Sequence, residues 1–181
     1  LVPGHEVTGV HQALGPVMLY APWGCRNCWI CDTGHEMICP DAAEAGLFVD
    51  GGYAEQMSVP HLEYLQPLGD LDPVKSAPLA CGGLTAFRAT RQAAEVLHRR
   101  GSKARALVIG AGGLGQFGIQ FLRLTSDAEV WVVDQSPQKR EKALELGADR
   151  AVGPGELDGT FDAIVDFVGA EPTLESAAQH V

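Results

Sequence analysis

The sequence predicts an α/β protein, in which part of a doubly wound parallel sheet follows part of a mostly β domain. Strand and helix patterns alternate from residue 106 onward, which is typical of a parallel sheet. A cluster of glycines separates the first of these strands from the first helix. Residues 1 to 70 are instead rich in glycine, proline and cysteine, with short strand candidates. We therefore predict two domains, 1–70 and 71–181.

Short strands and turns are predicted for the first domain. The runs 17–20 and 53–59 have the composition of strands, and 7–10 is strand-like. Asp50-Gly51-Gly52 predicts a turn, because aspartate and glycine favour turn conformations.

Four of the five cysteines lie close together in this domain, at Cys25, Cys28, Cys31 and Cys39. The spacing C-x2-C-x2-C-x7-C lets four thiolates close a tetrahedron around a metal ion, which predicts a closed structural zinc site. An iron–sulfur cluster is an alternative, since bacterial ferredoxin runs begin alike and end in Cys-Pro, as Cys39-Pro40 does. Their last gap is three residues, whereas here it is seven. Unligated thiols are the other alternative, and His35 is predicted to lie on the surface.

Two further groups in the first half carry ambiguous signals. Gly4-His5-Glu6 precedes the strand-like run, and a histidine beside a glutamate is more often structural than metal-binding. The fifth cysteine, Cys81, is isolated in the sequence. A single cysteine of this kind usually packs as a small apolar residue.

A helical zone is predicted at the start of the second domain. Asp72-Pro73 opens it, because proline suits the first turn of a helix. The segment 84–97 has apolar residues at helical spacing, and Gly101-Ser102 ends it.

After the helical zone, the second domain continues with a strand–turn–helix–strand pattern. The apolar run 106–109 is rich in β-branched residues and predicts a strand buried on both faces. A helix follows through 119–124, and a second buried strand, 130–133, ends at Asp134. The turn between the first strand and the helix contains the glycines Gly110, Gly112, Gly113 and Gly115.

This pattern predicts a Rossmann-like site for a dinucleotide. Gly110 permits a tight turn, Gly112 lets the backbone approach a pyrophosphate, and Gly115 lets the helix pack on the strand. The helix N-terminus offers N–H groups to phosphate oxygens. Asp134 stands 24 positions after Gly110, where a carboxylate accepts hydrogen bonds from ribose hydroxyls and repels a 2′-phosphate, which favours NAD. The predicted cofactor-binding residues of this pattern are Gly110, Gly112, Gly113, Leu114, Gly115 and Asp134. A plain structural turn, with Asp134 as a turn cap, is the alternative.

The remaining elements continue the alternation. Ser136 and Pro137 suit the N-cap and first position of a helix that runs through Glu145 and stops at Gly147. The strand candidates that follow are 150–152 and 161–168, and Glu171 opens a further helix. The second half of a complete dinucleotide fold is missing from this sequence.

Composition limits the partners and the location. The chain has 181 residues, of which 46% are hydrophobic, and a net charge of −10 from 13 basic and 23 acidic residues. The absence of a basic run argues against nucleic acid as a partner. No apolar stretch is long enough to span a bilayer, which argues against a membrane partner. The clustered cysteines favour a metal site in a reducing, cytoplasmic compartment.

Five motifs in one fixed order resemble the zinc-dependent medium-chain alcohol dehydrogenases. They are GHE (4–6), the four-cysteine segment, DGGYAE (50–55), APLACGGLTAFRA (77–89) and VIGAGGLG (108–115). The resemblance implies a GroES-like catalytic domain before a Rossmann domain. It also implies a hydride transfer between a primary or secondary alcohol, or its aldehyde or ketone, and NAD. A structural and a catalytic zinc, and a homo-oligomer such as a dimer or tetramer, are implied as well.

The resemblance also implies roles for residues that the motifs alone leave open. His5 and Cys81 correspond to ligands of the catalytic zinc, with Glu6 in or next to its coordination sphere. Thr85 corresponds to a threonine near the nicotinamide, and Lys139 to a basic residue near the adenosine ribose. Phe167 and Val168 correspond to apolar residues on the adenine side.

The sequence departs from the family pattern in three places. The first catalytic-zinc cysteine and the residue that relays the alcohol proton are expected upstream of residue 1. A longer stretch that the family usually has between the positions of Gly15 and Pro16 is missing from this sequence. The second half of the cofactor domain is absent, so a fragment or a shortened member is expected. A non-catalytic nucleotide- and zinc-binding fragment and a zinc-free reductase of the same superfamily are the alternatives.

Overall fold

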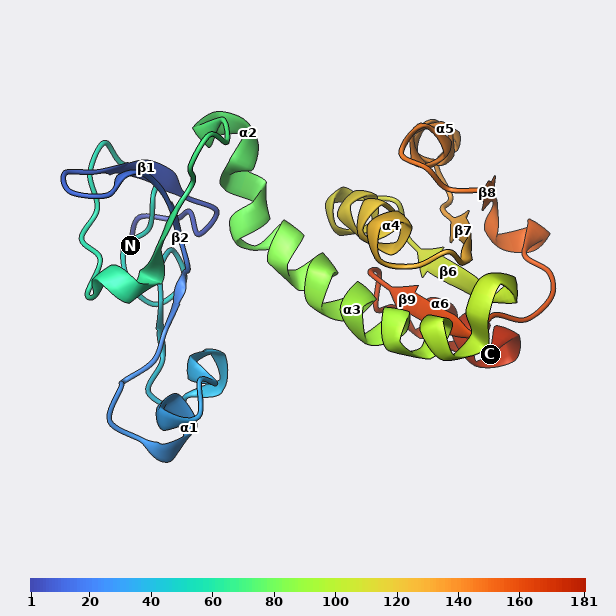
Figure 1. The fold of residues 1–181 in the computed structure, drawn as a ribbon, viewed down its shortest axis with the longest axis horizontal. Helices are drawn as coiled ribbons and strands as arrows, with labels where there is room; N and C mark the ends of the chain where they lie inside the picture. Colours follow the sequence, from blue (N-terminus) through green and yellow to red (C-terminus); the bar gives the residue numbers. More distant parts are fainter. The chain divides into compact units, whose positions relative to one another are not determined.

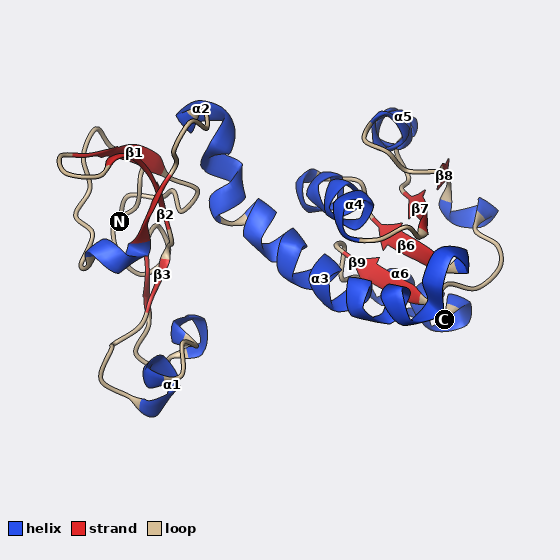
Figure 2. Cartoon of the chain, in the orientation of Figure 1, coloured by secondary structure: helices blue, strands red, loops and turns tan.

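The structure is a computed structural model that describes residues 1–181, apart from the side chain of Ser102 (Figures 1 and 2). The chain forms two compact units, Leu1–Gly82 and Gly83–Val181. Among the described residues, no helix is both long and apolar enough to cross a membrane.

The first unit is built on short antiparallel strands. A three-stranded sheet has the order β1-β2-β5, with β1 at Thr8–His11, β2 at Gly15–Leu19 and β5 at Leu65–Pro67. A second pair joins β3 (Pro22–Trp23) to β4 (Ala43–Glu44), and the short helix α1 (Trp29–Asp32) lies between them in sequence. The core of this unit contains Leu19, Ala21, Trp23, Ala45 and Tyr64.

The strand expected at 53–59 is not formed. In the three-stranded sheet, β2 pairs with β1 and β5, and 53–59 is not a member of any sheet among the described residues. The chain just before it is bound instead to the N-terminus, since the N–H groups of Gly51 and Gly52 donate to the carbonyl oxygens of Val2 and Gly4. Residues 54–60 then continue as bends and irregular chain that belong to no strand.

The segment 71–82, which opens the second predicted domain, packs on the first unit. The helix α2 (Pro73–Ser76) contacts β1 and β2, and the Thr8 hydroxyl donates to the carbonyl of Pro73 at 2.9 Å. The Asp72 carboxylate accepts from the N–H of Lys75 at 3.0 Å, which is the expected N-cap. The first compact unit therefore extends to Gly82.

The second unit is a parallel sheet with helices between its strands, as predicted. Its elements are α3 (Gly82–Arg100, whose first residue belongs to the first unit), β6 (Arg105–Ile109), α4 (Gly113–Thr125), β7 (Glu129–Val133), α5 (Pro137–Glu145), β8 (Arg150–Val152), β9 (Ala163–Asp166) and α6 (Glu171–His180). The strand order is β8-β7-β6-β9. β9 is shorter than the predicted 161–168, because its partner β6 ends at Ile109 and the pairing stops there.

The strands alternate their side chains between two apolar clusters, which fixes the layers of this unit. Val108 and Val132 face a cluster that includes residues of α3, α4 and α5. Leu107 and Trp131 face the opposite cluster, which Ala177 of α6 joins. Both strands are thus buried on both faces, and their carboxyl ends meet at one edge of the sheet. This is the edge at which ligands of doubly wound sheets bind.

Candidate functional site

The turn after β6 brings two backbone segments into close contact. Gly110 has a φ of +89°, a left-handed conformation that favours glycine. A Cβ on Gly115 would lie 1.8 Å from the carbonyl oxygen of Gly110, so any side chain there displaces the backbone. These two glycines are therefore required by the fold itself.

The other two glycines of the turn are not required by the protein's own packing. A Cβ on Gly112 or on Gly113 would meet no atom within 4 Å, and neither residue has a positive φ. The space beside them is open. Glycine at these positions suits the close approach of a ligand rather than the packing of the chain.

The N-terminus of α4 points unpaired donors at this open space. Gln116 is the first residue here whose N–H has a backbone acceptor, since it donates to the carbonyl oxygen of Gly112 at 2.9 Å. For the N–H groups of residues 112–115, the described chain supplies no backbone or side-chain acceptor. Four free donors at the start of a 13-residue helix fit a phosphate group.

Asp134 lies beside this turn, at the end of β7. One carboxylate oxygen accepts from the N–H of Ala111 at 2.8 Å, and the other accepts from the N–H of Ser136 at 2.8 Å. Asp134 therefore caps the next turn and also holds the glycine-rich turn. Each oxygen has a second lone pair, so the carboxylate keeps the capacity to accept from ribose hydroxyls.

The other cofactor residues implied by the resemblance lie around the same sheet edge. Lys139 is exposed in the first turn of α5. The Phe167 ring packs against α4, where a Cβ on Gly118 would lie 2.5 Å from it. Val168 is 54% exposed, and a Cβ on Gly110 would lie 2.6 Å from its side chain. Phe167 is thus part of the core packing, whereas Val168 borders the turn.

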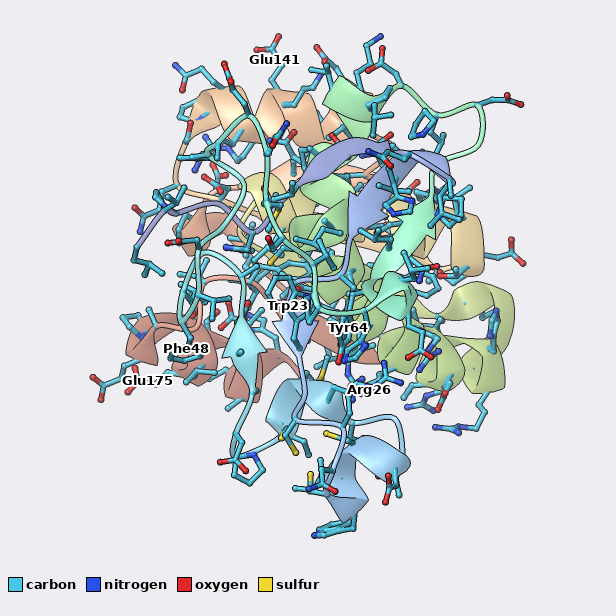
Figure 3. The ribbon with its side chains drawn as sticks, turned by 90° about the vertical axis from the view of Figure 1, so that its left-hand side faces the viewer. Trp23, Arg26, Phe48, Tyr64, Glu141 and Glu175 are labelled. Atoms are coloured by element: carbon cyan, nitrogen blue, oxygen red, sulfur yellow. The ribbon has the colours of Figure 1, made fainter. Side chains whose placement is uncertain are left out.

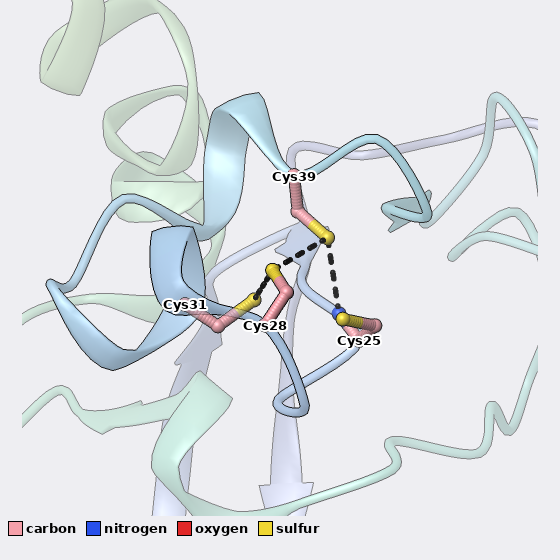
Figure 4. A group of neighbouring side chains, drawn as sticks. All are labelled: Cys25, Cys28, Cys31 and Cys39. Atoms are coloured by element: carbon pink, nitrogen blue, oxygen red, sulfur yellow. Dashed lines mark hydrogen bonds between the residues drawn. The ribbon is translucent and has the colours of Figure 1, made fainter.

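The four clustered cysteines converge as predicted (Figure 4). Their Sγ atoms all lie within 4.8 Å of one another. The Sγ atom of Cys28 is 3.6 Å from that of Cys31 and 3.8 Å from that of Cys39. Zn–S bonds of about 2.3 Å give a tetrahedron whose edges are about 3.8 Å long, so the residues fit a zinc ion.

The thiols of the cluster differ in how readily they ionise. Burial raises the pKa of the Cys31 thiol to about 12, whereas the N–H of Cys25, which donates to Cys39, lowers the pKa of that thiol to about 7. A metal ion is what would hold Cys31 as a thiolate at neutral pH. Gly24 is part of the same packing, because a Cβ there would lie 2.6 Å from the Sγ atom of Cys31. As expected, His35 is exposed and bonds only locally, with Thr33.

Sequence reasoning missed how this cysteine segment is anchored to the unit. Arg26, the one non-glycine residue with a positive φ among the described residues, forms an ion pair with Glu63. In Figure 3, Arg26 lies just beyond Tyr64, whose ring is 6.1 Å from that of Trp23 in the core. Arg26 lowers the pKa of the Glu63 carboxyl through this hydrogen bond and its charge. Arg26 and Glu63 are 37 positions apart in the sequence, so their pairing could not be predicted. The position of Arg26 between two of the cysteines was the only sequence signal for its anchoring role.

The residues implied for a catalytic zinc come from two segments of the first unit that are joined by one hydrogen bond. The Glu6 carboxylate accepts from the N–H of Gly82 at 2.9 Å, which ties the His5 segment to the residue after Cys81. The ligand atoms of His5, Glu6 and Cys81 do not, however, form a group within 4.8 Å among the described residues. These residues therefore do not form a completed metal site here. Thr85 is exposed in the first turn of α3.

Comparisons with known proteins agree with this geometry. Residues 113–181 match the family model described as zinc-binding dehydrogenase. An NAD-dependent alcohol dehydrogenase from Sulfurisphaera tokodaii is 33% identical over 94% of this chain and 54% of its own length. A D-arabinose 1-dehydrogenase (NADP(+)) from Saccharolobus solfataricus is 31% identical over 97% of this chain and 53% of its own. The chain spans about half the length of these curated relatives.

Solved structures support the same assignment. The crystal structure of the D-arabinose dehydrogenase from Sulfolobus solfataricus superimposes with a TM-score of 0.91 at 31% identity, covering 99% of this chain and 61% of that one. The four-cysteine cluster, which could hold a metal ion, agrees with the description of the matching family as zinc-binding. The chain belongs to the medium-chain, zinc-binding alcohol dehydrogenase family.

Proposed function

We propose that this chain is the zinc- and NAD-binding part of an oxidoreductase. Its substrate would be a primary or secondary alcohol, or the corresponding aldehyde or ketone. The observation that carries the proposal is the row of four unpaired N–H groups at residues 112–115, which includes Gly112 and Gly113 with open space beside them and adjoins Asp134. An alcohol dehydrogenase and an NADP-dependent sugar dehydrogenase among the relatives support a nicotinamide cofactor and a hydroxylated substrate.

The residues of the chain divide the work of holding the cofactor. The N–H groups of residues 112–115 bind the pyrophosphate, and the dipole of α4 adds to this attraction. The carboxylate of Asp134 orients the adenosine ribose, with Lys139 at its rim and Val168 beside the turn. The nicotinamide, when bound, supplies the hydride acceptor, while the protein binds and orients it.

Zinc has two proposed places in the first unit. We assign a structural ion to Cys25, Cys28, Cys31 and Cys39, which would cross-link the segment 25–39 and support folding. We assign a second, weaker site to His5 and Cys81, with Glu6 beside it and Thr85 near the nicotinamide. In a reducing, cytoplasmic compartment these thiols would stay available for metal. A homo-oligomer without nucleic-acid or membrane partners completes the proposal.

The proposed function is tested by binding and by turnover. NADH is titrated into the zinc-loaded chain while its tryptophan fluorescence is followed. NAD reduction is then measured with primary and secondary alcohols. Binding of NADH with turnover of at least one alcohol is expected. Binding without any turnover would favour a non-catalytic fragment, and no binding would reject the proposal. Turnover by a chain that retains no zinc would favour a zinc-free reductase.

Asp134→Gly is expected to change the choice of cofactor. The carboxylate accepts hydrogen bonds from ribose hydroxyls but repels a 2′-phosphate, so the unaltered chain should prefer NAD by about tenfold to a thousandfold. The variant should bind NAD less tightly and lose most of this preference. Dissociation constants for NAD and NADP, measured by calorimetry on both proteins, provide the test. Equal or tighter binding of NADP by the unaltered chain would refute the assignment.

His5→Ala is expected to remove metal from the weaker site alone. The neutral imidazole is a strong zinc ligand, and the remaining candidates do not form a closed set. Elemental analysis at a fixed excess of zinc should show less metal in this variant. His35→Ala is the matched control, because His35 is an exposed histidine beside the cysteine cluster. Equal metal content in both variants would show that His5 is not a ligand.

A further inference from the structure

Arg140 in α5 makes contacts that neither the motifs nor the resemblance indicates. Its Nη1 atom donates to the carbonyl oxygen of Asp134 at 2.8 Å and to that of Gln135 at 3.0 Å. Both carbonyls lie in the loop between β7 and α5. Arg140 is half-buried as a residue, and its bond to the Asp134 carbonyl is partly buried, whereas its bond to the Gln135 carbonyl is exposed.

These contacts complete a frame around Asp134. Its N–H donates to the carbonyl of Val152 in β8 at 3.2 Å, and its two carboxylate oxygens accept from Ala111 and Ser136. Its carbonyl oxygen accepts from Arg140. Every backbone and side-chain polar atom of Asp134 therefore has a partner, which fixes the direction of the carboxylate before any ligand arrives.

We propose that Arg140 is a positioning residue that holds the β7–α5 loop and so sets how strictly Asp134 selects NAD over NADP. This inference rests on the proposed dinucleotide site. The guanidinium bridges two successive carbonyls and so resists rotation of the Asp134–Gln135 peptide. Its bond to the Gln135 carbonyl also holds the Gln135–Ser136 peptide, whose N–H donates to the Asp134 carboxylate. Rotation of that peptide would remove this donor and let the carboxylate turn away from the ribose hydroxyls and from the position of a 2′-phosphate.

Geometry rather than charge is the basis of this role. Arginine presents its donors in a rigid, planar fork, whereas lysine is a flexible point charge. Both bonds here come from the Nη1 atom, whose two N–H groups have fixed directions in the guanidinium plane. The Nζ atom of a lysine would keep the positive charge without these fixed directions. A simple electrostatic role predicts no loss in Arg140→Lys, whereas a positioning role predicts a loss in both Arg140→Lys and Arg140→Met.

A direct contact of Arg140 with the cofactor would lead to a different prediction. Its Nε and Nη2 donors have no acceptor among the described residues, so a 2′-phosphate contact is the rival assignment. In that case Arg140→Met would weaken NADP binding and leave NAD binding unchanged. If Arg140 is a positioning residue, Arg140→Met instead weakens NAD binding and lowers the ratio of the NADP to the NAD dissociation constant.

The experiment measures NAD and NADP dissociation constants by calorimetry for the unaltered chain, Arg140→Lys, Arg140→Met and Lys142→Met. Lys142→Met is the matched control, since it removes a charge from an exposed lysine of the same helix. We expect the NAD dissociation constant to rise about three- to tenfold, and the preference for NAD to fall by at least as much, in both Arg140 variants. The control should be unchanged. Near-ultraviolet circular dichroism verifies that each variant is folded.

The outcomes separate the two proposals. An unaltered chain that binds neither dinucleotide overturns the proposed function and this inference with it. If the unaltered chain binds NAD and both Arg140 variants keep its affinity and preference, only the positioning role is overturned. An Arg140→Lys variant that matches the unaltered chain, or an Arg140→Met variant that loses NADP binding alone, overturns it as well.

Discussion

Replacing Cys28 by serine is expected to release the structural zinc and to destabilise the first unit. The Sγ atom of Cys28 lies 3.6 Å from that of Cys31 and 3.8 Å from that of Cys39, so its loss removes one vertex of the tetrahedron. Few other contacts hold the segment 25–39, because its elements are one helical turn and one 3-10 turn. The free energy of metal binding is then a large part of its folding free energy.

The expected loss is about 3 kcal/mol or more in the free energy of unfolding, with a fall of about 10 °C in the melting temperature. Elemental analysis should find about one zinc ion fewer per chain than in the unaltered protein. Thr33→Ser is the control, because it also changes one small side chain of this segment but removes no metal ligand. Retention of zinc by the Cys28 variant, or iron with acid-labile sulfide in the unaltered chain, would reject the zinc assignment.

The alternation of strands and helices in the second unit was predictable because its signals are local. The apolar runs at 106–109 and 130–133 predict buried strands, and both are central strands of the sheet. The Ser136 cap and the Pro137 start of α5 also follow from neighbouring residues. The convergence of the four cysteines was predictable for the same reason, since their spacing alone limits the loop.

The contacts that arrange the site were not predictable, because they join residues that are remote in sequence or ordinary in type. The bond from Gly82 to Glu6 spans 76 positions. Arg140 is one of two adjacent basic residues on an exposed helix, and nothing in the sequence distinguishes its bonds to Asp134 and Gln135. The failed strand at 53–59 has a similar cause. Its composition favours a strand, but residues 51–53 donate their N–H groups to the N-terminal segment instead, a contact between residues about 50 positions apart.

The glycines of the turn after β6 separate what folding requires from what a ligand requires. Gly115 packs on the Gly110 carbonyl, whereas Gly112 faces open space. A motif read from sequence treats all of these glycines as one signal. The structure divides them, and this division can be tested with the same substitution at two positions.

Gly115→Ala is expected to destabilise the second unit and to remove dinucleotide binding. Alanine normally gains about 1 kcal/mol over glycine inside a helix. Here its Cβ would stand 1.8 Å from a backbone oxygen, which cannot move as a flexible side chain does. Overpacking of this kind costs about 1–3 kcal/mol, so the clash should outweigh the gain in helix propensity. We expect a melting temperature lower by several degrees and no measurable NADH binding, because α4 must shift away from β6.

Gly112→Ala is the matched comparison, since it makes the same chemical change three positions earlier in the chain. Its Cβ meets no atom within 4 Å and its φ of −75° suits alanine, so the melting temperature should stay unchanged. The new methyl group would nevertheless occupy the space proposed for the pyrophosphate, and the NADH dissociation constant should rise about tenfold or more. Thermal melts and fluorescence titrations of both variants provide the test. If Gly112→Ala binds NADH as the unaltered chain does, the open space beside Gly112 is not where the cofactor lies. If Gly115→Ala melts at the unaltered temperature, the close contact of α4 with the Gly110 carbonyl is not what holds the turn.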